Sequence, residues 1–222
     1  MGLLSDKERQ HLQNVFAKSL TNEIKLMMFT QEFECATCRD TKEMILELSQ
    51  TSMKLKVEVC DFVKDKEKVK EFNIDKIPAI ALVGKKSYGI RFYGAPSGYE
   101  FAALIEDIVD VSNGKTSLLT QTKEKLKKIT KPIHIQVFTT PTCPYCPQAV
   151  RLAHQFAVEN SLVVADMIEI MEFPFLGERY AVMGVPKTVI NETINFVGAL
   201  QEERFLEYVL AAQSKAESTM FI

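Results

Sequence analysis

The chain has 222 residues, of which 46% are hydrophobic and 25% charged, with a net charge of −2 and a pI near 6.0. This length suits one large domain or two of about 110 residues. The charge balance gives no basic excess that would indicate nucleic acid or an anionic membrane as partner. No run approaches the ~18–20 apolar residues of a membrane span, and no signal peptide pattern opens the chain, so we expect a cytoplasmic protein.

The cysteines are the first sign of chemistry. Five cysteines are too few for the disulfide framework of a small secreted protein. Four of them form two Cys-x-x-Cys pairs, Cys35/Cys38 and Cys143/Cys146, and Cys60 is left over. In a reducing compartment, paired cysteines indicate catalysis or metal binding more often than structural cross-links.

The first half of the chain reads as a mixed succession of strands and helices. Ser5 and Glu8 have the spacing of a capping box that opens a helix. Two later strands flank a helix, and such a connection crosses over right-handed into a parallel pair. The elements predicted after the first helix are a strand at 24–29, a helix after Cys38, a strand at 55–60, a short helix at 66–72, strands at 79–83 and 88–93, and a helix at 101–109.

The second half repeats this order. Residues 112–116 read as a helix stop and short linker with Gly114 near the helix end, so we expect domains at 1–116 and 117–222. The elements predicted in the second domain are a helix near 120–129, a strand at 133–138, a helix after Cys146, strands at 187–190 and 193–197, and a helix at 205–212.

The spacing of the cysteines to two prolines makes the repeat specific. Cys35 precedes Pro78 by 43 residues, and Cys143 precedes Pro186 by the same 43 residues. In both copies an aromatic residue lies six positions before the proline and an aliphatic residue lies directly before it. The chain is therefore expected to contain one structural unit twice, each copy with its own cysteine pair and proline.

Each cysteine pair is predicted at a turn between a strand and a helix. The N-terminus of a helix favours a thiolate over a thiol, because it carries a partial positive charge and free N–H groups. Pro144 suits the first helical position, with Cys143 outward near the cap and Cys146 one turn in and buried. We expect Cys143 to be the nucleophile and Cys146 the resolving cysteine, and Cys35 and Cys38 to have the same two roles.

The two pairs are not expected to be equally reactive. Glu32 and Glu34 lie just before Cys35, and acidic neighbours oppose thiolate formation. Asp61 and Glu169 occupy equivalent positions, each 26 residues after the first cysteine of its own copy. Either carboxylate is a candidate proton carrier for the resolving cysteine, although a solvated carboxylate at a strand end is the simpler interpretation. Cys60 is interpreted as a buried small hydrophobe, and His154 as a packing or surface residue.

Cys143-Pro144-Tyr145-Cys146 is identical to the glutaredoxin active-site tetrapeptide, and the order of elements around it resembles the thioredoxin/glutaredoxin fold. Two such units in one chain resemble the glutaredoxin-like protein disulfide oxidoreductases. The resemblance implies an α/β protein of two tandem units, each a four-stranded mixed sheet flanked by helices. It also implies reduction, oxidation or isomerisation of protein disulfides, with cis bonds at Ile77–Pro78 and Val185–Pro186 that face the cysteines and bind an extended substrate.

The sequence departs from those families in three places. Thioredoxins carry a buried acid six residues before the first cysteine, where this chain has Phe29 and Val137. The Gly-Gly-Asp-type turn with which glutaredoxins bind glutathione is not reproduced after Gly94 or Gly198. Cys35-Ala36-Thr37-Cys38 is not a standard tetrapeptide of either branch, so the second pair is expected to be the more active.

Two other functions remain open at this point. Four cysteine thiolates suit Zn²⁺ or an iron–sulfur cluster, but structural zinc pairs usually lie ~15–20 residues apart in sequence. The tandem unit also resembles the N-terminal region of alkyl hydroperoxide reductase flavoproteins, which implies electron transfer to a peroxiredoxin. The chain has no G-x-G-x-x-G fingerprint. We therefore expect no cofactor, and electrons from a separate thioredoxin-reductase-like donor.

Overall fold

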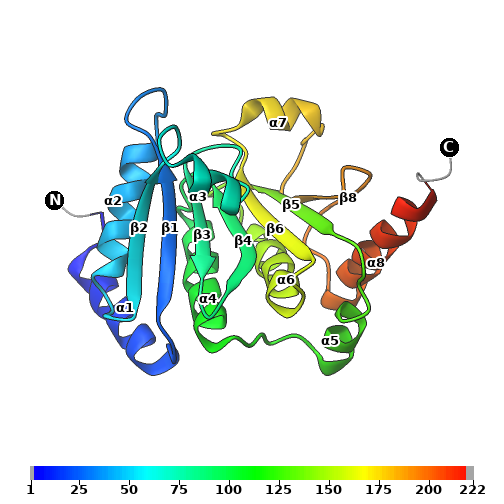
Figure 1. Ribbon diagram of the computed structural model, residues 1–222, viewed down its shortest axis with the longest axis horizontal. Coiled ribbons are helices and arrows are strands. Elements are labelled where there is room, and N and C mark those ends of the chain that lie inside the picture. Colours follow the sequence, from blue (N-terminus) through cyan, green and yellow to red (C-terminus); the bar gives the residue numbers. More distant parts are fainter. Residues whose placement is uncertain (1–2, 219–222) are drawn as a thin grey trace.

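The computed structural model describes residues 3–218, in which helices and strands alternate along the chain (Figure 1). The first half contains α1 (Asp6–Ser19), β1 (Ile24–Thr30), α2 (Cys38–Ser49), β2 (Leu55–Asp61), α3 (Lys66–Glu71), β3 (Ala79–Val83), β4 (Ser87–Tyr93) and α4 (Tyr99–Asn113). The second half contains α5 (Thr120–Leu126), β5 (Ile133–Thr139), α6 (Cys146–Glu159), β6 (Val163–Glu169), α7 (Pro174–Arg179), β7 (Lys187–Ile190), β8 (Ile194–Val197) and α8 (Glu202–Ser218). None of the helices in residues 3–218 is long and apolar enough to cross a membrane.

Local sequence signals explain several helix ends. The Ser5 hydroxyl accepts the backbone N–H of Glu8, and the Glu8 carboxylate accepts the backbone N–H of Ser5, which confirms the predicted capping box. Helix α4 ends at Gly114, whose φ of 61° lies in the left-handed region where a residue without Cβ is favoured. The expected domain boundary at residue 116 falls in the connection that follows, and it stays a prediction.

The strand order of the sheet repeats itself. The eight strands lie in the order β2-β1-β3-β4-β6-β5-β7-β8, so that each half contributes four adjacent strands with the same internal order. The pair β1/β2 is parallel, as predicted from its crossover, and β5/β6 of the second unit is parallel as well. The pairs β3/β4 and β7/β8 are antiparallel hairpins. The sheet therefore confirms an α/β protein built from two four-stranded mixed units.

The two units share one continuous sheet, which the sequence pattern did not predict. Strand β4 of the first unit pairs in parallel with β6 of the second, from Ile90 opposite Ala165 to Tyr93 opposite Ile168. Each of these strands would otherwise be the edge of a four-stranded sheet with unpaired N–H and C=O groups. Their pairing places the C-terminal ends of β4 and β6 side by side.

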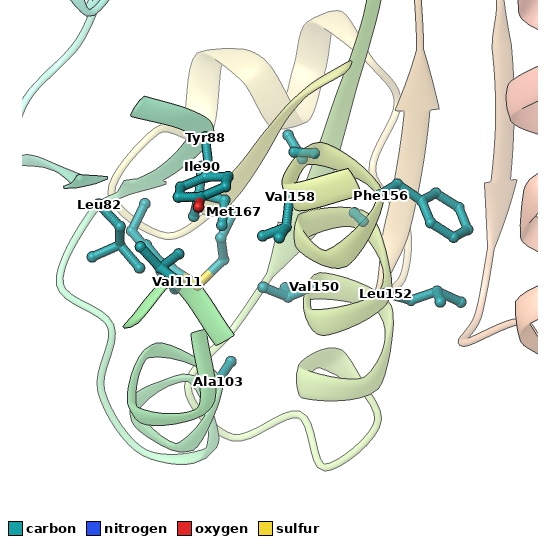
Figure 2. Packing of buried hydrophobic residues seen from close by; sticks show 14 of the residues in the cluster. Leu82, Tyr88, Ile90, Ala103, Val111, Val150, Leu152, Phe156, Val158 and Met167 are labelled. Carbon is teal, nitrogen blue, oxygen red and sulfur yellow. The ribbon is translucent and has the colours of Figure 1, made fainter. Parts of the chain in front are cut away.

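The apolar core is also shared. Figure 2 shows side chains of β4 (Tyr88, Ile90), of β6 (Met167) and of helices α4 and α6 gathered around one space. A second, smaller cluster on the other face of the sheet lies under α3 and α7 and includes Phe29, Tyr93 and Phe138. Both clusters contain residues of both units. Burial of apolar surface therefore stabilises each unit and also the joint between them, which is formed where β4 pairs with β6.

Two polar networks also cross the joint. Arg91 on β4 donates to both carboxylate oxygens of Asp166 on β6, from Nε at 2.6 Å and from Nη2 at 2.9 Å, and both side chains are buried. The His134 ring contacts the same carboxylate, with Nε2 2.6 Å from Oδ2. Burial by itself would raise the pKa of Asp166, but the Arg91 charge and the contact with His134 outweigh it and lower that pKa to about 2.

The second network joins the helices behind the sheet. Arg151 on α6 makes ion pairs with Glu106, Asp107 and Asp110 on α4. His154 is fully buried with its Nδ1 2.6 Å from Oδ2 of Asp107, which confirms a packing role for this histidine.

We predict that Asp166→Asn destabilises the chain by about 3–5 kcal/mol, because it leaves the Arg91 guanidinium buried without its counter-charge. The measurement is the free energy of unfolding in urea at neutral pH. The matched control is Glu58→Gln, which breaks the exposed Lys25–Glu58 pair and should cost no more than about 1 kcal/mol. Equal effects of the two substitutions would show that the buried pair does not hold the joint.

Candidate active site

The second cysteine pair lies at the expected turn between β5 and α6. Cys143 and Cys146 form a disulfide with their Cα atoms 5.5 Å apart. Cys143 is 7% exposed and Cys146 is fully buried, which agrees with the predicted order of burial. The helix begins at Cys146 rather than at Pro144, because Pro144 and Tyr145 lie in a turn closed by the Cys146 N–H, which bonds to the Cys143 carbonyl at 3.4 Å.

This later start corrects the predicted role of Pro144 and explains the neighbouring proline. Tyr145 is the cap residue, so Pro147 lies in the first helical turn, where backbone N–H groups have no partner within the helix. A proline there costs no hydrogen bond. The Tyr145 side chain is 67% exposed beside the disulfide.

The first cysteine pair has the same local geometry. Cys35 and Cys38 form a disulfide with their Cα atoms 5.4 Å apart, at the turn between β1 and α2. Cys38 is fully buried, and Cys35 is half-buried, which makes it more exposed than Cys143. In each pair the first cysteine is therefore the one that solvent and substrates reach first.

The two prolines singled out by the repeat adopt the conformation that the resemblance implied. The bonds Ile77–Pro78 and Val185–Pro186 are both cis. Each proline is buried, and its carbonyl accepts a glycine N–H: Gly94 to Pro78 at 2.9 Å, and Gly198 to Pro186 at 2.8 Å. The two units thus build this loop with the same contacts.

A buried carboxyl group lies next to the loop of the second cysteine pair. Glu100, in the first turn of α4, is 1% exposed and accepts the Thr139 hydroxyl at 2.5 Å. The adjacent Tyr99 N–H donates to the carbonyl of Pro141, two residues before Cys143. Burial, together with the nearby Glu169 and Glu172 carboxylates, raises the pKa of Glu100 to about 8 despite the Thr139 hydrogen bond.

Glu169 and Glu172 extend this group of acids toward the first cysteine pair. Glu169 ends β6, is 2% exposed and accepts the backbone N–H groups of Met171 and Glu172. Burial raises the pKa of Glu169, and the Glu172 charge adds to that shift. The Glu172 carboxylate accepts the hydroxyl of Thr37, which lies between Cys35 and Cys38.

Asp61 and Glu169 occupy equivalent positions in the sequence repeat, but they have different surroundings in the structure. Asp61 is partly exposed and accepts the backbone N–H groups of Val63 and Lys64, and these bonds lower its pKa. It fits the interpretation as a solvated carboxylate at a strand end, whereas buried Glu169 does not. Cys60 is buried as predicted, and burial raises the pKa of its thiol.

Glu100 and Glu172 were not predicted from the sequence. The position six residues before Cys143, where thioredoxins carry an acid, holds buried Val137, and the buried carboxyl group bonded to Thr139 is Glu100 of the other unit. The sequence repeat does not predict Glu100. The position in the second copy that corresponds to Glu100, counted from Gly198 instead of Gly94, holds Arg204. Both glutamates act across the joint between the units, which no local pattern reveals.

The described part of the chain offers no set of ligands for the metal-binding alternative. Residues 3–218 contain no group of three or more His, Cys, Asp and Glu side chains placed to hold a metal ion. Each cysteine pair is placed for two-electron exchange between a disulfide and a dithiol.

Comparison with known proteins agrees with this geometry. The family model described as "Thioredoxin domain" matches residues 133–211. Thioredoxin of Methanocaldococcus jannaschii is 37% identical over 78 residues, which cover 35% of this chain and 92% of that protein. The protein disulfide oxidoreductase of Aeropyrum pernix superposes with a TM-score of 0.90 at 34% identity, covering 95% of this chain and 94% of that one.

A third similarity is to the alkyl hydroperoxide reductase component AhpF of Enterococcus faecalis. Its structure superposes with a TM-score of 0.86 at 25% identity, covering 93% of this chain and 99% of that chain. The corresponding alkyl hydroperoxide reductase proteins of Staphylococcus aureus are longer, and the match spans 28% of their length.

The fold, the two disulfides in strand-to-helix turns and these similarities define a thiol–disulfide oxidoreductase of the thioredoxin fold. Within that class, the chain belongs to the glutaredoxin-like protein disulfide oxidoreductases, which carry two thioredoxin-like units.

We predict that the chain loses stability as the pH rises from 4.5 to 8 and that Glu100→Gln removes part of this loss. Over this range the unfolded chain has released the Glu100 proton, whose usual pKa is 4.5, while the folded chain keeps it up to about 8. Unfolding therefore releases a proton, and stability falls by up to about 1.4 kcal/mol per pH unit.

The measurement is the urea unfolding free energy of wild type and Glu100→Gln at pH 5 and pH 8. Because glutamine is neutral and still accepts the Thr139 hydroxyl, the free energy of unfolding of the variant, relative to that of wild type, should be higher at pH 8 than at pH 5. The control is Glu178→Gln, at an exposed residue of α7, which should leave the slope unchanged. A slope identical in wild type and Glu100→Gln would contradict a raised pKa at this residue.

Proposed function

We propose that Cys143 and Cys35 are the nucleophiles of two dithiol–disulfide exchange sites and that Cys146 and Cys38 resolve their intermediates. The supporting observation is that both pairs form disulfides in which the first cysteine is the more exposed. In each pair the second cysteine begins a helix and is fully buried.

The exchange follows from this arrangement. In the reduced protein the Cys143 thiolate attacks one sulfur of a substrate disulfide, forms a mixed disulfide and releases the other substrate sulfur as a thiolate. The Cys146 thiolate then attacks the Cys143 sulfur, which releases the second substrate thiolate and closes the Cys143–Cys146 disulfide. Two electrons pass from the chain to the substrate, and the same steps in reverse oxidise a substrate dithiol.

The substrate-binding residues in this proposal are Ile77, Pro78, Val185 and Pro186. In each unit Ile77 or Val185 is only partly buried and lies two residues before a strand, β3 or β7, so its backbone is placed where the sheet begins. An extended substrate segment binds to such a backbone by main-chain hydrogen bonds, which are insensitive to the identity of the substrate side chains. This suits protein dithiols and disulfides as the substrate class.

The second site is proposed as the more active of the two. The thioredoxin family match spans only residues 133–211, which include Cys143 and Cys146. At the first site Cys35 shares a surface cavity with three carboxylates and two cations, so the excess charge there is negative and opposes thiolate formation.

We further propose that a separate thioredoxin-reductase-like protein in the cytoplasm supplies the electrons. A second candidate function is electron transfer to a peroxiredoxin, which the similarity to the alkyl hydroperoxide reductase component AhpF favours. In that case the reduced cysteine pair passes its two electrons to the disulfide of the peroxiredoxin.

We predict that Cys143→Ser removes most of the insulin-reducing activity with dithiothreitol as electron donor, and that Cys35→Ser removes less. The reason is that the variant without Cys143 lacks the nucleophile of the more reactive site. The control is Cys60→Ser, because Cys60 lies outside both pairs and is buried. Equal loss from the two nucleophile variants would overturn the ranking of the sites, and no loss from either would overturn the proposed chemistry.

For the second candidate, we predict that the reduced chain transfers electrons to a bacterial peroxiredoxin disulfide faster than it reduces insulin, if electron delivery is its main role. Single-turnover mixing of the reduced chain with each acceptor, followed by alkylation and mass spectrometry, gives the two rates. Faster reduction of insulin would reject the carrier function in favour of general disulfide exchange.

A further inference from the structure

The turn of the first cysteine pair is held by a residue of the other unit. Thr37 is the cap residue of α2, but its side chain makes no capping hydrogen bond to its own helix. The Thr37 hydroxyl donates instead to Oε2 of Glu172, which lies 135 residues further along the chain, just after β6. A cap threonine ordinarily uses its oxygen to accept an N–H of the first turn, so this contact replaces the usual one.

Glu172 is itself held in place by other bonds. Its second oxygen, Oε1, accepts the backbone N–H of Ala95 at 2.7 Å, and its own N–H donates to Glu169 Oε2 at 2.8 Å. Gly94 makes the approach possible: a Cβ at this position would lie 2.7 Å from the Glu169 Cβ and 3.0 Å from Glu172 Oε1. The carboxylate is therefore fixed between the turn of the first pair and the end of β4.

The second cysteine pair has no equivalent contact among the described residues. The offset between Cys35 and Cys143 places Lys64 at the position of Glu172 in the first unit, and Tyr145 at the position of Thr37 in the second. Tyr145 is mostly exposed, and Lys64 pairs with Asp61 instead. The contact is thus a difference between two otherwise matching sites.

We propose that Glu172 is a positioning residue of the first redox site, which fixes the Cys35–Cys38 turn through Thr37 and disfavours the Cys35 thiolate with its negative charge. This proposal deepens the proposed function and rests on it, because it concerns the reactivity of Cys35 as a nucleophile. It assigns the second unit a direct effect on the chemistry of the first.

The charged groups around Cys35 set the expected direction. Arg39 and Lys42 on α2 share the cavity of Cys35 with three carboxylates, so the cations there do not exceed the anions. On the other side of the turn lie Glu172 and, behind it, Glu169 and Glu100. A carboxylate held on this side adds negative potential and stabilises the thiol and the disulfide relative to the thiolate. The charged groups on both sides of the turn, together with Glu34 directly before Cys35 in the chain, are Glu32, Arg39, Lys42, Asp61, Asp65, Glu100, Glu169 and Glu172.

The test follows the pH dependence of Cys35 alkylation in the full-length chain. Cys143 and Cys146 are replaced by serine in every variant, so that Cys35, Cys38 and buried Cys60 are the remaining thiols. Iodoacetamide modification of Cys35 in the reduced protein is followed by mass spectrometry of its peptide. We expect Glu172→Gln to move the midpoint of the Cys35 profile to lower pH and to increase the rate at pH 7 by about threefold to tenfold. Glu178→Gln, an equal change of charge at an exposed residue of α7, should leave the profile unchanged.

A second pair of variants separates positioning from a general effect on folding. Thr37→Val removes the hydroxyl that holds the Glu172 carboxylate against the turn but leaves its charge, so it should shift the profile in the same direction as Glu172→Gln and by less. Thr37→Ser keeps the hydroxyl and should restore the parent profile. In the combination of Thr37→Val with Glu172→Gln, the shift should equal that of Glu172→Gln alone, because the position of the side chain at 172 no longer matters for Cys35 once its charge is removed.

The proposal is overturned if Glu172→Gln leaves the midpoint in place, if Glu178→Gln shifts it equally, or if Thr37→Ser behaves like Thr37→Val. These outcomes are distinct from failure of the proposed function, because alkylation requires no disulfide substrate. A chain that fails to reduce insulin would still report the Cys35 profile, and a chain that reduces insulin can still show no effect of Glu172.

Discussion

The pairing of β4 with β6 is the constraint on which the rest of the molecule depends. It turns two four-stranded units into one sheet, and it gives both otherwise unpaired edges a partner. The Arg91–Asp166 pair is buried on these strands, and the ion pairs between α4 and α6 tie the helices behind them. A buried ion pair stabilises only when its geometry satisfies both charges, so it selects this particular alignment of the strands.

The joint also determines the surroundings of the two redox pairs. Because β4 and β6 are parallel, the loops after both strands lie at one edge of the sheet, and these loops carry Gly94, Ala95 and Glu172. Helix α4 of the first unit brings Glu100 to Thr139 at the end of β5. Each unit therefore supplies acidic groups to the site of the other, although each cysteine pair and its proline come from a single unit.

This exchange makes two copies of one unit chemically different. The second site has a buried carboxyl group, Glu100, beside its loop, with a pKa raised to about 8, while the first has Glu172 bonded to the residue between its cysteines. Such differences allow two dithiols of similar local geometry to differ in reactivity, since the thiolate responds to nearby charge and to burial. The two cysteine pairs therefore lie in different surroundings, although the units that carry them are copies of one fold.

The features that local sequence predicts are those that depend on neighbours in the chain. Three features are of this kind: the capping box at Ser5, the placement of each cysteine pair between a strand and a helix, and the equal spacing of Cys35 and Cys143 to their prolines. The start of α6 was predicted two residues too early, because Pro144 and Tyr145 belong to a turn closed by Cys143 and Cys146, which leaves no sequence signal.

The amino-acid sequence by itself therefore determined the duplication of one unit, the succession of helices and strands around each cysteine pair and the residues of both pairs, because repeat spacing and periodicity are properties of the chain. The class of fold followed from the resemblance that these features carry. Only the tertiary structure decided that the two sheets become one, that His134 joins the Arg91–Asp166 pair, and that Glu100 and Glu172 reach across the joint. The physical reason is distance along the chain. Thr37 and Glu172 are 135 residues apart, and only the pairing of β4 with β6 brings them into contact.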